Sequence, residues 1–328
     1  MKKCLAALLL TALCALLLSG CGKEAERRDI RIGCFPNVTH VQALVARNMS
    51  RHGEGWFERY LPEGTPVTWL TYNAGPTAME ALFGKTADLT YVGPSPAINA
   101  YAVSEGREVR LLAGAVNGGA ALLVAPGSGI RTAADFRGRC VATPQLGNTQ
   151  DVSCRAWLRA HGLHTTIVGG GDCRVSPTPN AMQAQLMKQG SIDAAWTVEP
   201  WVSTLEQSVG ARVLAEEPQV VTTVLAARVG WLKRNPDTAA ALLRAHRELT
   251  RWILDHPAEA QARVTEELSE LTRTPVSPAT VAAAWKRLTL TDSLDRPQLE
   301  QFVKDAQQAG LLDRVPPLKD LFYTPEEL

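Results

Sequence analysis

Four segments of this chain combine hydroxyl and amide side chains with proline or glycine, and none of them contains a lysine or arginine. They are Cys34–His40, Tyr72–Thr77, Val92–Pro96 and Thr143–Asp151. Each segment follows an expected strand and leads into an expected helix. The first turn of a helix has unpaired backbone N–H groups and the positive end of the helix dipole, so it binds anions without a formal charge. The segments therefore predict a site for a small, weakly basic oxyanion such as a sulfonate or nitrate.

The candidate ligand contacts are the polar side chains near these helix starts. They are Asn37, Thr39, His40, Asn73, Ser95, Gln145, Asn148 and Thr149. For any single segment, ordinary helix capping is the commoner explanation, because Ser, Thr and Asn cap helices routinely. Four such segments together favour a binding site. The turns at Ser95 and at Asn148 and Thr149 are the strongest, because a nearby glycine permits close backbone approach to a ligand.

A fifth segment, residues 194–201, ends an expected strand with an acidic residue and two indoles. Trp196 either covers the apolar part of a ligand or fills the core. Glu199 either holds a ligand ammonium group or caps the helix that starts at Pro200. Trp201 is expected in the core. We therefore take Trp196 and Glu199 as further candidate contacts.

The elements that must position these residues alternate between strands and helices. We expect strands at 30–35, 67–72, 88–92, 109–115, 122–125, 140–143, 173–176 and 194–198, and helices at 38–50, 76–83, 96–104, 132–136, 149–161, 181–188 and 200–209. This alternation predicts an α/β fold in which parallel sheets have helices on both faces. Ligands of such sheets bind at the carboxyl ends of the strands.

Two lobes are expected, because about 300 residues exceed what one hydrophobic core usually serves. A β-branched stretch at 220–228 is expected to return the chain to the first lobe. Helices then follow at 238–255, 257–271, 277–288 and 297–309, and we expect them to brace that lobe. Crossovers are predicted near 117–121 and 219–223. Lobe I would comprise residues 30–118 and 222–328, and lobe II residues 119–221.

The N-terminus has the pattern of an export signal. Lys2 and Lys3 precede an apolar run at 5–18, which is shorter than the roughly 20 residues that span a bilayer. The run ends in Leu-Ser-Gly-Cys, which resembles the lipobox of bacterial lipoproteins. We predict a signal peptide at 1–20, a lipidated Cys21 and a polar tether at 21–29; the alternative is an ordinary cleaved signal.

Composition excludes several classes of partner. Because 34 basic residues face 33 acidic ones and no basic run occurs, we expect no nucleic-acid binding. Cysteine and histidine spacing supports no metal site, and no cofactor is expected. Four cysteines remain after Cys21. Cys140 and Cys173 each lie four residues before a proline, so they could form a disulfide between neighbouring strands; the alternative is four free thiols.

Residues 29–101, 145–158 and 192–201 resemble the substrate-binding proteins of sulfonate, taurine and nitrate ABC importers. The most specific stretches, Pro144–Asp151 and Glu199–Trp201, are closer to the sulfonate and taurine members. The resemblance implies a periplasmic-binding-protein clamp that holds an anion between its lobes, with Ser95, Asn148, Thr149 and Trp196 among the contacts.

The same resemblance implies a binding protein, not an enzyme. It would be a monomer, lipid-anchored on the extracytoplasmic face of a bacterial membrane, and it would deliver its ligand to permease and ATPase subunits. The Asn37–His40 turn departs from the family pattern, which leaves nitrate, another oxyanion or a thiamine-pyrimidine precursor as alternative ligands.

Two other classes are weaker. Enzymes that build the thiamine pyrimidine resemble this fold, but they use a cysteine-rich iron-binding motif that this chain lacks. Cys34 and His40 could form a nucleophile–base pair, yet no third orienting residue is apparent. A subunit that feeds a separate sensor is the remaining possibility.

Overall fold

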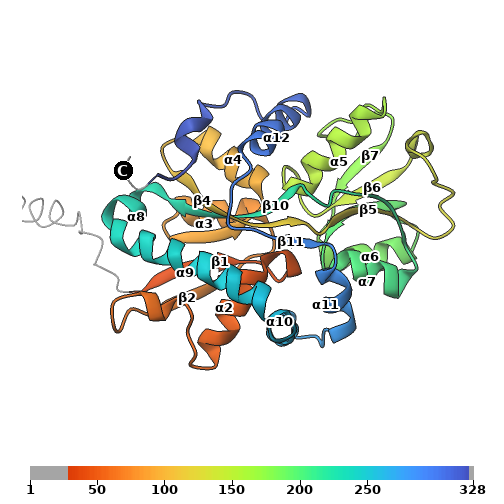
Figure 1. Ribbon diagram of the computed structural model, residues 1–328. Helices are drawn as coiled ribbons and strands as arrows, with labels where there is room; N and C mark the ends of the chain where they lie inside the picture. Colours follow the sequence, from red (N-terminus) through yellow and green to blue (C-terminus); the bar gives the residue numbers. More distant parts are fainter. Residues whose placement is uncertain (1–28, 325–328) are drawn as a thin grey trace, which may run out of the picture.

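Two α/β lobes, each built on its own sheet, make up the computed structural model, which describes residues 29–324 (Figure 1). Lobe I has a six-stranded sheet of order β11-β4-β10-β3-β1-β2, and lobe II has a five-stranded sheet of order β7-β6-β8-β5-β9. The predicted two-lobed α/β clamp is confirmed. The predicted signal peptide, Cys21 and nearly all of the tether lie outside the described residues.

The sheet of lobe I combines parallel and antiparallel strands. Its strands are β1 (Ile30–Cys34), β2 (Val67–Thr71), β3 (Leu89–Val92), β4 (Val109–Gly118), β10 (Val221–Arg228) and β11 (Leu288–Leu290). β1 pairs in parallel with β2 and β3, whereas β10 is antiparallel to β3 and β4, and β11 is antiparallel to β4. The expectation of a purely parallel sheet was therefore wrong. β10 re-enters lobe I at the end where β4 leaves it, so it must run in the opposite direction.

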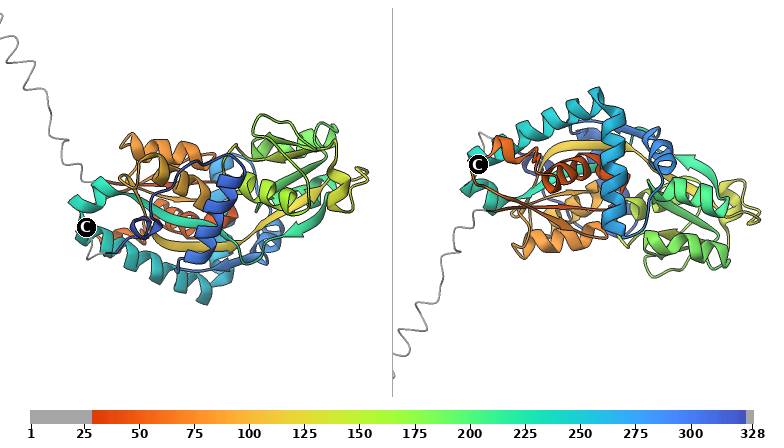
Figure 2. Two further views of the ribbon diagram at one scale, coloured as in Figure 1. Left: turned by 90° about the horizontal axis from the view of Figure 1, so that it is seen from above. Right: turned by 90° about the horizontal axis from the view of Figure 1, so that it is seen from below.

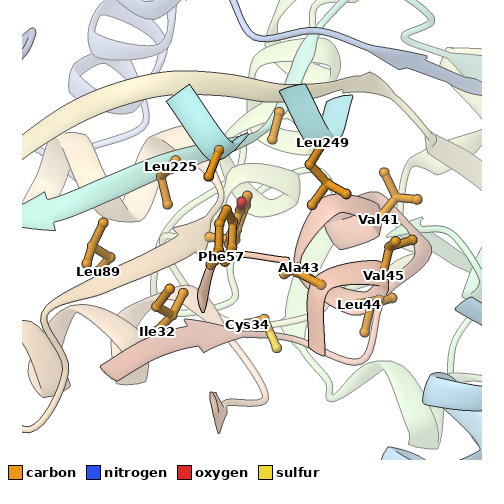
Figure 3. Close-up of a cluster of buried hydrophobic side chains, with 14 of the residues drawn as sticks. Ile32, Cys34, Val41, Ala43, Leu44, Val45, Phe57, Leu89, Leu225 and Leu249 are labelled. Carbon is orange, nitrogen blue, oxygen red and sulfur yellow. The ribbon is translucent and has the colours of Figure 1, made fainter. Parts of the chain in front are cut away.

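Helices cover both faces of this sheet. They are α2 (Val41–Arg51), α3 (Gly75–Phe83), α4 (Pro94–Val103), α8 (Val229–Arg234), α9 (Pro236–Asp255) and α10 (Pro257–Thr272). α2, α9 and α10 pack on one face, where Ile32, Leu44, Leu225 and Leu249 belong to one buried cluster (Figure 3). α3 and α4 pack on the other face. Successive strand residues alternate between these two clusters, as the pleat of a strand requires.

Lobe II follows the same plan with fewer elements. Its strands are β5 (Ala120–Val124), β6 (Cys140–Thr143), β7 (Arg174–Pro177), β8 (Ala194–Val198) and β9 (Arg212–Glu216), and its helices are α5 (Thr149–Ala160), α6 (Asn180–Lys188) and α7 (Trp201–Val209). α5 covers one face of the sheet, and α6 and α7 cover the other. β5 pairs antiparallel with β8 and β9, so this sheet is mixed as well.

The C-terminal helices contact both lobes. α11 (Pro278–Trp285) packs against α7 of lobe II, and α12 (Arg296–Gln308) packs against α4 of lobe I and α5 of lobe II. The C-terminal segment therefore runs along the junction of the lobes (Figure 2). These helices brace lobe I as expected, since α11 also packs against α10, and in addition they contact lobe II. The sequence pattern missed β9, α8 and β11, which are short or flank a longer element.

The chain crosses between the sheets twice. The first crossover is Gly118 and Gly119, both at positive φ, and the second is residues 217–220. A Cβ at Gly118 would lie 2.5 Å from the carbonyl oxygen of Arg287, and one at Gly119 would lie 2.5 Å from the Leu288 side chain. Only glycine suits these positions, because a side chain would meet both backbone strain and a steric clash.

A buried ion pair ties the C-terminal segment to lobe II. The Arg287 guanidinium lies 3.0 Å from Glu199, 3.0 Å from Glu206 and 2.9 Å from Glu216. Glu199 is fully buried, and its carboxylate also accepts hydrogen bonds from the backbone N–H and hydroxyl of Ser203. Burial raises the pKa of Glu199, and the Ser203 and Arg287 contacts oppose that rise.

Arg287→Met should destabilise the protein in a pH-dependent way. The variant leaves the Glu199 carboxylate buried without its cation, which costs about 1–3 kcal/mol at about pH 8. A carboxyl whose pKa is raised by folding is increasingly penalised as the pH rises through that pKa, so the deficit should shrink at about pH 5. Urea unfolding at the two pH values measures the difference. A deficit that is equal at both values, or larger at the lower one, would contradict this account of Glu199.

The matched control is the double variant Glu199→Gln with Arg287→Met. It removes the buried charge along with its partner, so the pH dependence should disappear even though the loss of packing remains. Glu206 and Glu216 are the other two carboxylates around Arg287, and both are more exposed than Glu199.

The Cys140–Cys173 disulfide is excluded by strand register. Cys140 pairs with Arg174 across β6 and β7, one residue away from the expected match with Cys173. A shift of one residue reverses the face to which a side chain points. Cys140 accordingly packs under α6 and α7, whereas Cys173 packs under α5. Cys34, Cys140, Cys154 and Cys173 are all free and buried.

A thiol titration of residues 29–328 should give four thiols after denaturation without reductant. The folded protein should react slowly, because burial raises the pKa of Cys34 to about 12 and that of Cys173 to about 11, and the thiolate is the reactive form. A count of two thiols in the denatured sample would show that two of the four cysteines form a disulfide.

Candidate functional site

The junction of the lobes encloses a small polar cavity of about 30 Å³. Lobe I contributes Phe35, Asn37, Asn73, Ala74, Gly75, Gly93 and Pro96, and lobe II contributes Pro144, Asn148, Thr149, Gln150, Asn180 and Val198. None of these side chains carries a charge. One water-sized group needs roughly 10–15 Å³ of such space, so the cavity has room for a small polar head group.

Four helices begin at this cavity. The starts of α3, α4, α5 and α6 all contribute lining residues. At α4, Pro94 and Pro96 have no N–H to offer, and the hydroxyl of Ser95 is buried with no partner among the described residues. At α5, Asn148 caps the helix by accepting a hydrogen bond from the Asp151 N–H at 2.8 Å. The cavity is therefore surrounded by the positive ends of helix dipoles and by neutral donors.

The two lobes touch beside the cavity. The Ser95 N–H donates to the Thr149 hydroxyl across the junction at 3.4 Å. A Cβ at Gly93 would lie 2.3 Å from that hydroxyl oxygen, so glycine is what allows the lobes to approach this closely. The Trp201 indole N–H also donates to the Asn37 side chain at 3.0 Å. The structure is thus a closed arrangement of the two lobes.

The structure brings several predicted residues together. Asn37, Asn73, Asn148 and Thr149 line the cavity, and Ser95 lies between the lining residues Gly93 and Pro96. Gln145 belongs to the same turn as Asn148 but does not line the cavity. The role of these residues as ligand contacts stays a prediction.

Thr39 and His40 are candidate contacts that do not line the cavity. Thr39 is buried beside the first crossover, where a Cβ at Gly119 would lie 3.0 Å from its methyl group. His40 is buried against Phe35, with ring centroids 4.4 Å apart, and its Nδ1 accepts the Phe35 N–H at 3.4 Å. Burial lowers the pKa of His40 to about 3, so the imidazole is neutral and shapes the Phe35 turn.

Trp196 is a core residue of lobe II, contrary to its candidate role. It is fully buried among the apolar residues beneath α5, and its ring meets Trp157 edge-on at 6.2 Å. Val198, two residues later in β8, is the residue that reaches the cavity. A strand advances about 3.3 Å per residue, so Trp196 lies about 7 Å short of the strand end.

Glu199 follows its helix-capping alternative, because its carboxylate accepts the Ser203 N–H in the first turn of α7. Its carboxylate is held by Ser203 and Arg287, and it does not line the cavity. It therefore supplies no counter-charge for a ligand ammonium group. The expectation that Trp201 is a core residue was incomplete, because its indole reaches across the junction to Asn37.

The sequence pattern missed Gln150 and Asn180. Asn180 is the first residue of α6 and lines the cavity from lobe II. The segment Pro177-Thr178-Pro179-Asn180 ends β7 and starts a helix. This segment has the same construction as the four strand-to-helix segments described above, so the sequence alone could have predicted Asn180 as a candidate contact.

A larger cavity of about 590 Å³ lies between α5 and α12. Its lining includes the carboxylates of Glu217 and Asp305 as well as Trp157 and Phe302. Burial raises the pKa of Glu217 to about 7. Arg159 also lines this cavity, but it is paired with Asp305 at 2.9 Å, so two acidic groups face one committed cation and disfavour an anion there.

The Cys34 and His40 pair lacks the protonation states of a nucleophile and base. Burial raises the pKa of Cys34 to about 12 and lowers that of His40 to about 3, so the thiol stays protonated and the imidazole is a weak base.

Across residues 29–324, no group of three or more His, Cys, Asp or Glu side chains is arranged for a metal ion. Within the same span, no helix has the length and apolarity needed to cross a bilayer.

Two known proteins are similar to this chain in sequence. A Bacillus subtilis protein named for binding aliphatic sulfonates is 25% identical over 256 residues, which are 74% of this chain and 73% of that protein. An Escherichia coli protein of the same name is 30% identical over 160 residues, 48% of each chain.

Solved structures show the same fold. The alkanesulfonate-binding protein SsuA from Xanthomonas axonopodis pv. citri, bound to MOPS, has a TM-score of 0.74 and 20% identity, covering 91% of this chain and 99% of that one. The nitrate-binding protein NrtA from Synechocystis has a TM-score of 0.69 and 18% identity, covering 88% and 83%. The architecture is that of periplasmic binding proteins. The model of the NMT1-like family matches residues 23–268, and the chain belongs to that family.

Proposed function

We propose that this protein is the extracytoplasmic solute-binding component of an ABC importer and that it binds an aliphatic sulfonate between its lobes. The observation that carries the proposal is the uncharged cavity at the junction, which four helix starts surround. The names of the Bacillus subtilis and Escherichia coli relatives support the sulfonate class. Ser95, Asn148 and Thr149 are the proposed contacts of the anionic head group.

Neutral donors suit a weakly basic anion. Helix N-termini and amide or hydroxyl groups stabilise one negative charge without the strong attraction of a buried arginine. A ligand held in this way is released readily when the lobes separate, as delivery to a transporter requires. The proposed partners are therefore a permease and an ATPase, and the proposed unit of delivery is a monomer with residues 30–118 and 222–328 as lobe I and 119–221 as lobe II.

The cavity favours a simple alkanesulfonate over taurine. Two carboxylates adjoin the lining in sequence, and the protein already occupies both. Arg287 and Ser203 hold Glu199, and Arg155 and Thr143 hold Asp151. The taurine ammonium group would therefore enter without a counter-charge. Nitrate is the second candidate, because a cavity of about 30 Å³ also suits a small inorganic anion.

Calorimetric titration against ethanesulfonate, taurine, nitrate and thiamine-pyrimidine precursors tests the proposal. Ethanesulfonate should bind most tightly, and at about a hundredfold its Kd it should stabilise the fold by about 2.7 kcal/mol. Ser95→Ala should weaken it about ten- to hundredfold, because a hydrogen bond to a charged group contributes about 1.5–3 kcal/mol.

Ser104→Ala is the matched control, because Ser104 ends the same helix and donates its hydroxyl to Tyr101 away from the cavity. Its affinity should stay within about twofold of wild type. Preferential binding of nitrate would replace the sulfonate assignment, and binding of a pyrimidine precursor alone would overturn it.

We further propose that Cys21 carries a lipid anchor. The basis is the Leu-Ser-Gly-Cys sequence that ends an apolar run of signal-peptide length. Cys21→Ala should abolish labelling by a fatty-acid analogue and release the protein from the membrane fraction. Cys34→Ala is the control, because Cys34 is a buried residue of the lobe I core. If labelling survives in Cys21→Ala, the proposal that Cys21 carries the lipid anchor is contradicted.

A further inference from the structure

Of the five amide side chains in the cavity wall, three combine an oxygen atom that the protein already occupies with an NH2 group that is left for the cavity. They are Asn37 from lobe I and Gln150 and Asn180 from lobe II. An amide has an acceptor end and a donor end, and rotation by half a turn exchanges them. Whichever end the protein occupies, the other end remains for a ligand. The orientation of these amides therefore decides whether the cavity offers donors or acceptors.

Asn37 is oriented by Trp201. The indole N–H of Trp201 lies 3.0 Å from Asn37 Oδ1, across the junction of the lobes. An indole N–H is a donor and has no acceptor capacity, so the atom that meets it must be the amide oxygen. Among the described residues, Asn37 Nδ2 has no hydrogen-bond partner, and this nitrogen is left for the cavity.

Asn180 is oriented by two residues of lobe II. Its Oδ1 accepts from the Thr197 hydroxyl at 2.9 Å and from Gln183 Nε2 at 3.2 Å. Gln183 is itself fixed, because its Nε2 also donates to the carbonyl oxygen of Thr178 at 3.0 Å. Turning Asn180 over would place its NH2 group against that of Gln183. Two donors repel each other, so the Asn180 nitrogen stays turned away from Gln183.

Gln150 is oriented through Asn148. The Asp151 N–H donates to Asn148 Oδ1 at 2.8 Å, which fixes Asn148 with its oxygen toward the helix. The Asn148 NH2 group then donates to Gln150 Oε1 at 3.3 Å. Gln150 Nε2 has no partner within residues 29–324. One backbone N–H thus sets the orientation of two amides in succession.

We infer that these locked amides turn three donors and no acceptor of their own toward the cavity, and that Trp201, Gln183 and Asn148 are positioning residues that select anions over neutral isosteres. The inference rests on the proposed function of the cavity. All three nitrogens belong to lining residues, and each NH2 group can donate to an oxyanion. An amide that turned over would present its oxygen to the anion, replacing an attraction with a repulsion.

The test compares ethanesulfonate with ethanesulfonamide, which has a similar shape but carries no charge and has an NH2 group of its own. Trp201→Phe removes the indole N–H and keeps an aromatic ring. The freed Asn37 can still turn its NH2 group toward an anion, so ethanesulfonate should weaken only about twofold, which is the cost of selecting one of two amide orientations. The sulfonamide should lose less or gain, because a freed Asn37 can turn its oxygen toward the ligand N–H. A neutral hydrogen bond contributes about 0.5–1.5 kcal/mol, so the ratio of the two affinities should fall about five- to twentyfold.

Trp56→Phe is the matched control. The Trp56 indole donates to the Ala245 carbonyl at 3.0 Å within lobe I, far from the cavity lining. This variant loses the same kind of hydrogen bond, so it reports the cost to stability alone, and its affinity ratio should match that of wild type. Gln183→Met makes the same test from lobe II and serves if Trp201→Phe does not fold.

The outcomes separate the two proposals. Should both ligands weaken equally in Trp201→Phe and Gln183→Met, these residues have only a structural role and the inference is overturned while the proposed function stands. Should wild type bind no sulfonate, the proposed function fails and the inference fails with it. A ratio that falls in both variants and stays constant in Trp56→Phe supports both.

Discussion

The burial of Glu199 is the constraint on which the junction of the two lobes depends. Its backbone N–H donates to Gly119 in the first crossover, and its carbonyl accepts from Val38 of lobe I. Its carboxylate is held by Ser203 within lobe II and by Arg287 from the C-terminal segment. A buried carboxylate without such partners is costly, because transfer from water removes its hydration. The crossover, lobe I and the C-terminal segment therefore meet at one residue whose groups must all be satisfied.

That arrangement explains why the cavity itself has no charge. Arg287 is committed to three carboxylates, one of which is Glu199, and neither residue lines the cavity, so neither the cation nor the acid is available to a ligand there. In the proposed binding site, helix starts and amides are the groups left for recognition. Neutral groups make no strong demand for a counter-ion when the lobes open, and their specificity depends on orientation instead of charge. The hydrogen bonds that orient the lining amides therefore matter as much for specificity as the lining residues themselves.

Local patterns predicted most of the elements, because element type depends on short-range sequence. β6 and β8 begin and end at the predicted residues, and α5 begins at the predicted residue. Strand ends that lead into Pro, Gly, Ser or Asn did converge on one cavity. The pattern failed for short elements such as β11, whose pairing with β4 brings together residues about 170 positions apart. It also failed for side-chain direction, as Trp196 and the Cys140–Cys173 pair show.

The sequence by itself determined the α/β alternation, the two-lobed plan, the resemblance to sulfonate-binding proteins and the uncharged character of the strand ends, because each is written in the type and spacing of neighbouring residues. Only the tertiary structure decided which of those residues face the cavity. Strand register set the faces of Cys140 and Cys173. Contacts between distant residues set the rest: Trp201 and Asn37 are 164 positions apart, and Arg287 and Glu199 are 88 apart. The direction and partner of a buried polar group depend on what the fold places opposite it, and local sequence carries no record of that.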